Sequence, residues 1–396
     1  MTTGKISSSR REIVAALTIG SAALLMPGLQ PMLLGELVAQ KRISLAGVGL
    51  VAMGEIVALG LGVILGNSLL SPRRLSKTAV IAALLAALFD LLTMRLDGDT
   101  AFAVVRALCG LSEGVLVWVT TCVILRSAAP ARLAGIYLVV QTLAQAAVAA
   151  VLAWTVIPRA GWPGGFAALA GLSAASSILA PALRPRMPEL VAAESGRPPL
   201  SAAAIFTFLV VFAQMSAIGS LWAYLDPLGR GAGLDGESVR MLVSVVLLLQ
   251  VAGGSAGAIV VRRANAVPVL TAASLLQATI AFSVYALAGP AVMRFAVSCA
   301  VFGFVWLFLM PFQVRLALDA DPAGRVAMWV PALQLLGVAF GPLLASFFAA
   351  GEDARPVALV CGGFALAAVC LLLAGRRRFG ADRRENESLM RRGGTI

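Results

Sequence analysis

The chain contains 396 residues, of which 60% are hydrophobic and only 13% are charged. Soluble domains average about 45–50% apolar and about 25% charged residues, so this composition excludes both a soluble globular protein and a disordered chain. The formal net charge of +12 does not indicate a nucleic-acid-binding protein, because the basic residues lie in short segments between apolar runs, which is a signal of membrane topology.

Twelve apolar segments are long enough to cross a bilayer, since a helix of about 20 apolar residues spans the hydrocarbon core. The first segment is longer than a signal-peptide core and has no small-residue cleavage pattern, so no cleavable signal peptide is expected. The sequence therefore predicts an all-α polytopic membrane protein. In chain order the expected spans are 12–35, 44–70, 76–94, 101–125, 133–157, 164–183, 201–226, 238–261, 267–288, 291–315, 326–350 and 355–375.

A polar segment rich in proline separates the sixth span from the seventh and divides the chain into halves. Lysine and arginine are concentrated at the span ends on the side of this segment and of both termini, so we expect both termini to be cytoplasmic. High alanine, glycine and arginine usage suggests a bacterial inner membrane, and a monomer is the default expectation. The expected parts are an N-terminal six-helix bundle at 1–183, a cytoplasmic linker at 184–200, a C-terminal six-helix bundle at 201–376 and a basic cytoplasmic tail at 377–396.

Residues that could form an enzyme site or a metal site show no suitable arrangement in the sequence. Histidine is absent, and no nucleophile–base pair or Walker-type nucleotide loop is recognisable. We therefore expect a protein that is not an enzyme, has no metal or cofactor, and draws its energy from a proton gradient. The five cysteines lie in apolar spans without metal-like spacing, at Cys109, Cys122, Cys299, Cys361 and Cys370.

The fourth span contains the segment RALCGLSEG, which places Arg106 and Glu113 seven residues apart within an apolar run. Each ionised residue near mid-bilayer costs about 2.5–3.5 kcal/mol on insertion scales, so these residues must pair, face a wet cavity or perform a function. They share one helix face with Gly110 and Gly114, which leave that face bare of side chains. We expect this face to line a cavity, with Arg106 binding substrate and Glu113 carrying a proton. For Arg106 the competing use is a structural hydrogen bond between helices.

Two further carboxylates lie in the second and third spans. Glu55 is near the middle of its span and is expected to be a second proton-coupling residue, or else a protonated glutamate that ties helices together. Asp90 is nearer the outer end of its span. We expect Asp90 to take part in gating, with a solvated position or a pair with Arg95 as the alternatives.

The two halves of the chain show a weak internal repeat, as is common in transporters. Trp118 follows Arg106 by twelve residues, and Trp306 follows Arg294 by the same distance. Both tryptophans fall in the middle of their spans, away from the bilayer interface. We expect them to contact substrate, with core packing as the competing use.

A second spacing repeats in the spans that follow. Gln141 lies nine residues after Arg132, and Gln334 lies nine residues after Arg325. Both arginines follow a proline–alanine pair, so the two glutamines occupy matching positions of the halves. We expect both amides to bind substrate, although hydrogen bonding between helices is the alternative use of such residues.

Twelve spans, a polar central linker and a six-plus-six repeat resemble the major facilitator superfamily over essentially the whole chain. The loop after the second span keeps the glycine and basic pair of the superfamily motif Gly-x-x-x-Asp-Arg-x-Gly-Arg, as Gly66 and Arg73–Arg74, but lacks its aspartate. The resemblance implies a gating role for Arg73 and Arg74. The spacing Arg-x-x-x-Gly-x-x-Glu-Gly in the fourth span is similar to that of the proton-coupled anion symporters of the sialin group.

The expected function is proton-coupled secondary active transport of a small organic solute by rocker-switch alternating access. An organic anion is the preferred substrate, with Arg106 as the positive charge of the cavity. The alternative is proton-coupled efflux of amphipathic or cationic compounds. The expected partners are the lipid bilayer, the small-molecule substrate and protons, without nucleic acid.

Overall fold

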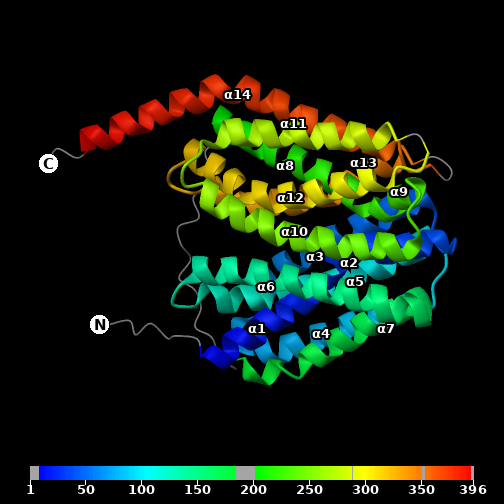
Figure 1. Cartoon of the computed structure of the whole chain (residues 1–396). Coiled ribbons are helices and arrows are strands. Elements are labelled where there is room, and N and C mark those ends of the chain that lie inside the picture. The colour runs from blue at the N-terminus through cyan, green and yellow to red at the C-terminus, as the bar shows by residue number, and fades with distance from the viewer. Residues whose placement is uncertain (1–8, 184–200, 288, 350–352, 394–396) are drawn as a thin grey trace.

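The computed structural model of the chain describes residues 9–183, 201–287, 289–349 and 353–393. The helices form two bundles, one from the N-terminal half, α1 to α7, and one from the C-terminal half, α8 to α14 (Figure 1). The linker expected at 184–200 lies outside the described residues. Helix α14 (Val357–Gly393) continues through most of the segment expected to be a tail.

The first span of each half is interrupted at a matching point. Helix α1 (Arg10–Ala23) ends at Leu24, whose φ of −103° and ψ of 10° leave the helical region, and α2 (Leu25–Ala39) continues the crossing. Helix α8 (Ala202–Ala223) ends in the same way at Tyr224, with φ −100° and ψ 11°, before the short helix α9 (Leu225–Gly231). Interrupted helices of this kind expose backbone carbonyls within a membrane protein, where they need partners.

Eleven stretches among the described residues are long and apolar enough to cross a membrane. One of them, Arg132–Ala182, has 51 residues, more than twice the length of a single crossing. It contains α6 (Pro130–Val151), the π-helical turn η2 (Leu152–Val156) and α7 (Ile157–Ser177). Gly161 interrupts α7 with a φ of 63°, which favours glycine, and divides the stretch into the expected fifth and sixth spans.

The remaining elements follow the expected spans closely. In the N-terminal half they are α3 (Leu45–Leu69), η1 (Pro72–Arg74), α4 (Leu75–Thr93), α5 (Asp99–Leu125) and η3 (Ala180–Ala182). In the C-terminal half they are α10 (Gly236–Val260), α11 (Ala266–Tyr285), α12 (Val292–Ala320), η4 (Ala327–Trp329) and α13 (Val330–Ser346).

Glycines bring pairs of helices into backbone contact within each bundle. A methyl group at Gly110 would collide with the Glu55 carbonyl, and one at Gly114 would collide with the Leu59 carbonyl, so α5 packs directly on α3. Gly253 of α10 meets α12 in the same way, which repeats this packing in the second half. The expectation that the Gly110–Gly114 face lines an open cavity is therefore wrong. Small residues suit close helix packing in a membrane as well as they suit a cavity wall.

Candidate functional site

A cavity of about 290 Å³ lies between the two bundles, near the small end of the usual range for ligand sites. Every side chain that lines it is uncharged. It combines aliphatic walls with several amide and indole groups, a lining suited to an amphipathic molecule. The polar and aromatic groups come from α6 (Gln141, Thr142, Gln145), α8 (Trp222), α10 (Gln250), α12 (Trp306) and α13 (Gln334).

A second cavity of about 830 Å³ leads away from this central cavity between α6 and α10. The two cavities share lining residues that include Leu138, Met310 and Gln334. The second cavity extends to Arg132, at the start of α6, and to Ala258, near the end of α10. The central cavity is thus reached from the end of the molecule where α1 begins, which we call the termini end; the opposite end is the far end.

Ion pairs join the two bundles at the far end. Glu36 of α2 accepts hydrogen bonds from Arg230, at 2.8 Å, and from Arg240, at 2.5 Å, which belong to α9 and α10. Arg230 also donates to Asp226, at 2.6 Å. One carboxylate of the N-terminal bundle therefore holds two arginines of the C-terminal bundle.

Two backbone contacts between the bundles reinforce this closure. Pro31 lacks the N–H that would bond the Pro27 carbonyl in a regular helix, and Trp222 of the other bundle donates its indole N–H to that carbonyl at 3.0 Å. Gly49 of α3 lies so close to α13 that a methyl group there would collide with the Pro342 carbonyl. The far end is closed by these contacts while the termini end is open.

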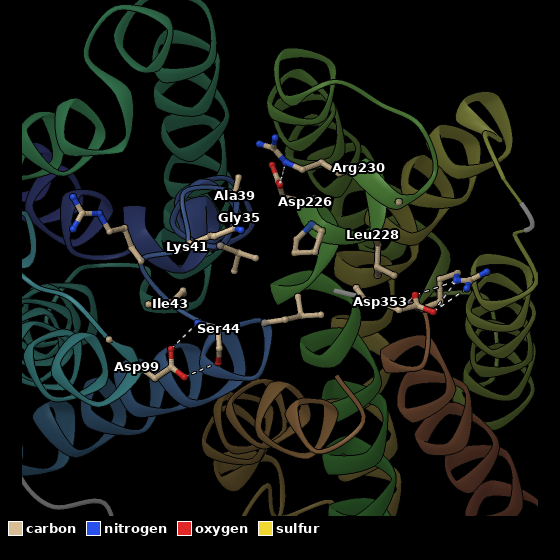
Figure 2. A pocket seen from close by; sticks show the side chains of 18 of the residues that line it. Gly35, Ala39, Lys41, Ile43, Ser44, Asp99, Asp226, Leu228, Arg230 and Asp353 are labelled. Carbon is tan, nitrogen blue, oxygen red and sulfur yellow. Dashed lines mark hydrogen bonds and ion pairs between the residues drawn. The ribbon is translucent and has the colours of Figure 1, made fainter. Parts of the chain in front are cut away.

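A wide pocket of about 900 Å³ lies at the far end, outside this closure. Figure 2 shows its charged and polar lining from both bundles, including Lys41, Ser44, Asp99 and Asp353. Asp99 accepts hydrogen bonds from the Ser44 amide at 2.7 Å and from its hydroxyl at 2.6 Å, which fixes the start of α3. The pocket shares no lining residue with the central cavity, as expected for two compartments on opposite sides of a closed gate.

Replacing Glu36 with glutamine is expected to make the far end open more often, because a neutral amide does not balance two arginines. A cysteine at Thr142 in the central cavity, in a Cys370→Ser background, should then react roughly five-fold faster with an impermeant thiol reagent applied from the far-end side. That factor corresponds to about 1 kcal/mol for a partly exposed ion pair. Glu237→Gln, an exposed acid in the first turn of α10, is the matched control. An equal rate in both variants would show that the Glu36 pairs do not hold the gate.

Four charged residues of the N-terminal bundle meet in one buried cluster. Arg106 donates to Asp90 at 2.6 Å and forms an ion pair with Glu55, and the carboxylate of Glu113 lies 3.6 Å from the guanidinium. All four side chains are almost completely buried. The guanidinium also lies over the ring of Phe166, 5.5 Å from its centroid. We call Arg106, Glu55, Asp90 and Glu113 the charge cluster.

The charge cluster differs from the expected cavity charge. Arg106 lies inside its own bundle between α3, α4 and α5 and is not part of the central cavity lining. Asp90 pairs with Arg106 instead of Arg95 and so belongs to the cluster. Arg106 and Glu113 lie on one helix face, as their spacing predicts, but the spacing does not reveal that α3 and α4 bring Glu55 and Asp90 to that face.

The remaining expected site residues fall into two groups. Gln141, Gln334 and Trp306 line the central cavity as expected. Trp118 instead packs on Gly66, where it fills the contact between α5 and α3, and no part of it lines the central cavity. The expected gating residues Arg73 and Arg74 are exposed in η1 at the termini end.

Sequence reasoning missed the bundle-to-bundle contacts of Glu36 and the cavity positions of Gln145 and Trp222. The sequence does contain a signal for the Glu36 contacts. Glu36 and Arg230 have opposite charges, and each lies near the end of the first span of its half. A signal for Gln145 was also present, since it follows Gln141 by four residues and so shares its helix face.

The sequence matches the family model described as Major Facilitator Superfamily over residues 13–330. No curated protein matches it. Among solved structures, a mutant of the nucleoside transporter NupG is similar with a TM-score of 0.73 and 12% identity, over 91% of this chain and 99% of that one. A bacterial homologue of the human lysosomal transporter Spinster, inward-facing and unoccupied, is similar with a TM-score of 0.64 and 13% identity, over 96% and 98%. At these identities the likeness concerns the fold alone.

Proposed function

This chain belongs to the major facilitator superfamily and is a multi-pass membrane transporter, not an enzyme, and we propose that it uses a proton gradient to move an amphipathic solute without negative charge through the central cavity. The observation that carries the proposal is that the buried charges lie apart from the central cavity. Arg106 and its carboxylate partners form the buried charge cluster inside the N-terminal bundle, and every side chain that lines the central cavity is uncharged.

The lining of the central cavity supports this class of solute. The rings of Trp222 and Trp306 meet edge to face with centroids 5.3 Å apart, and amides surround them. Trp faces accept planar or cationic groups, and amides provide hydrogen bonds. An anion would lose its hydration here without gaining a positive partner, which is costly. We therefore place the amphipathic solute ahead of the organic anion, for which Arg106 would have to line the cavity.

The charge cluster is suited to hold and release protons. Three ionised carboxylates around one guanidinium would leave two uncompensated negative charges in a dry interior, which is strongly unfavourable. Glu55 and Glu113 each keep one buried oxygen without a hydrogen-bond partner in the described structure, where a proton can reside. Glu113 makes the longest of the three ion pairs, at 3.6 Å, and is our proposed proton carrier.

Helix α3 links the charge cluster to both the cavity and the far-end gate. Glu55 belongs to the cluster, the next residue Ile56 lines the central cavity, and Gly49 touches α13 across the bundle boundary. Gain or loss of a proton changes the ion pairs that hold α3 to α4 and α5. This change would alter the cavity wall and the far-end contact through one rigid element, as rocker-switch transport requires.

The Glu113→Gln variant tests the proton coupling. In proteoliposomes with a pH gradient, accumulation of a transported solute should fall at least ten-fold, because the amide cannot release a proton. Exchange of labelled for unlabelled solute without a gradient should persist, since the cavity is unchanged. A screen with 2-naphthamide, 2-naphthoate and 2-naphthylmethylamine supplies an uncharged, an anionic and a cationic probe of similar shape.

The exposed-surface variant Glu237→Gln serves as the control and should keep gradient-driven accumulation. If Glu113→Gln accumulates solute as the unaltered protein does, Glu113 carries no proton and the coupling proposal fails. If 2-naphthoate is the only probe transported, the solute class is an organic anion and the proposed class is wrong.

A further inference from the structure

A chain of hydrogen-bonded amides runs from the central cavity into the C-terminal bundle. Gln334 donates to Gln313 at 2.8 Å, Gln313 donates to Gln214 at 3.0 Å, and Gln214 donates to the Ser274 hydroxyl at 2.8 Å. Gln313, Gln214 and Ser274 are completely buried, and Gln334 lines the cavity. The four residues come from α13, α12, α8 and α11; we call them the amide relay.

The relay has a fixed direction because it ends at a backbone carbonyl. The Gln214 amide nitrogen lies 3.5 Å from the Leu270 carbonyl oxygen, and a carbonyl can only accept hydrogen bonds. The Gln214 oxygen therefore faces Gln313, and the Gln313 amide nitrogen must be the donor to it. The same reasoning fixes Gln313, because turning over any one amide would set oxygen against oxygen or N–H against N–H.

This direction decides which atom Gln334 offers to the cavity. One N–H of its amide is donated to Gln313, so its oxygen is held at a fixed position as an acceptor for a solute. An amide that was free to turn over could offer either a donor or an acceptor. The relay removes that choice at one position, where it holds the Gln334 oxygen as an acceptor.

The N-terminal side of the cavity has the same polarity for an independent reason. Gln145 donates an amide N–H to the carbonyl of Leu24, at 2.5 Å, at the break between α1 and α2. Its oxygen is therefore also held as an acceptor. In the described structure, the Gln141 oxygen and the Gln250 amide nitrogen are buried without a partner. Two of the four lining amides, Gln334 and Gln145, thus bind protein through the nitrogen and keep the oxygen as an acceptor.

We infer that the central cavity selects its solute by N–H or O–H donor groups, and that the amide relay sets this preference through Gln334. The inference rests on the proposed function and names the polarity of the solute: an amphipathic amine, amide or alcohol, not a compound with acceptors alone. A solute without donors would leave the Gln334 and Gln145 oxygens without a hydrogen bond from the solute. Sites built to bond a polar group reject analogues that lack it far more strongly than apolar pockets reject a missing methylene.

Binding of a matched pair of probes tests the inference. Titration calorimetry should give about ten-fold tighter binding for 2-naphthamide, which has N–H donors, than for N,N-dimethyl-2-naphthamide, which has an acceptor only. In the Gln313→Leu variant Gln334 is free to turn over, so this ratio should fall to about two or less. Binding of the dimethyl probe should improve, which a merely structural loss would not produce.

Gln277→Leu is the matched control. Gln277 is a fully buried glutamine of α11 whose amide atoms have no partner in the described structure, and it lies outside the relay. This variant should keep the ten-fold ratio. An unchanged ratio in Gln313→Leu would overturn the role of the relay. Equal binding of both probes to the unaltered protein would overturn the donor preference while leaving the transport proposal intact. If 2-naphthoate bound and neither amide did, the proposed solute class and this inference would both fail.

Discussion

Replacement of Arg106 by methionine is expected to destabilise the protein by about 3–5 kcal/mol, the usual cost of removing one partner from a buried ion pair. Arg106 is completely buried and pairs with Asp90 and Glu55, and both would lose the cation that the described residues place beside them. The thermal midpoint of the purified protein in detergent should fall clearly. A loss below about 1 kcal/mol, the value of an exposed pair, would mean that the cluster is hydrated.

A compensated variant separates charge from packing in this experiment. Combining Arg106→Met with Glu55→Gln and Asp90→Asn removes the unpaired carboxylates together with their partner. Replacing a whole buried ion group by neutral residues is often close to neutral in stability, so most of the lost stability should return. Arg106→Lys keeps the charge but not the planar fork that reaches two carboxylates, and an intermediate loss is expected.

Gly49→Val is expected to hold the far end open and to reduce transport at least ten-fold. The added side chain would collide with the Pro342 carbonyl and the Ser346 side chain, and backbone cannot move aside within a packed helix pair. Spin labels at Lys41→Cys and Asp353→Cys, which face each other across the far-end pocket from opposite bundles, should then lie farther apart. Labels at Arg132→Cys and Ala258→Cys, across the termini-end cavity, should lie closer together.

Gly60→Val is the matched control for this prediction. Gly60 lies in the same helix, and a methyl group there would meet no atom within 4 Å. Both pairs of labels should keep the distances of the unaltered protein in this variant, measured in the Cys370→Ser background. Unchanged distances in Gly49→Val would show that α3 and α13 separate freely and that Gly49 is not part of the closure.

The fold could be predicted from the sequence because bilayer thickness fixes the length of each crossing. Apolar run lengths gave the spans, and the repeat gave the two halves. The helix breaks could not be found in this way. The signal is a proline three residues after each break. Pro27 and Pro227 lack the N–H that would bond the carbonyls of Ala23 and Ala223, the last residues of α1 and α8.

The candidate site was predictable as a set of residues but not as an arrangement. Arg106, Glu113, Glu55 and Asp90 each stood out because charge is expensive in hydrocarbon. Their meeting depends on the relative rotation of three helices, which the sequence does not reveal. The glycines misled for a related reason, since a stripe such as Gly110 and Gly114 fits a cavity wall and a close helix contact equally well.

The uncharged lining of the central cavity has an electrical consequence. A membrane potential of 100 mV acts on each unit charge with about 2.3 kcal/mol when that charge crosses the whole bilayer. Because the lining carries no charge, the moving cavity wall contributes no charge of its own to the voltage dependence of the cycle. With the proposed proton coupling and an uncharged solute, the charge moved in each turnover would be that of the proton alone, and the transport current would equal the proton flux.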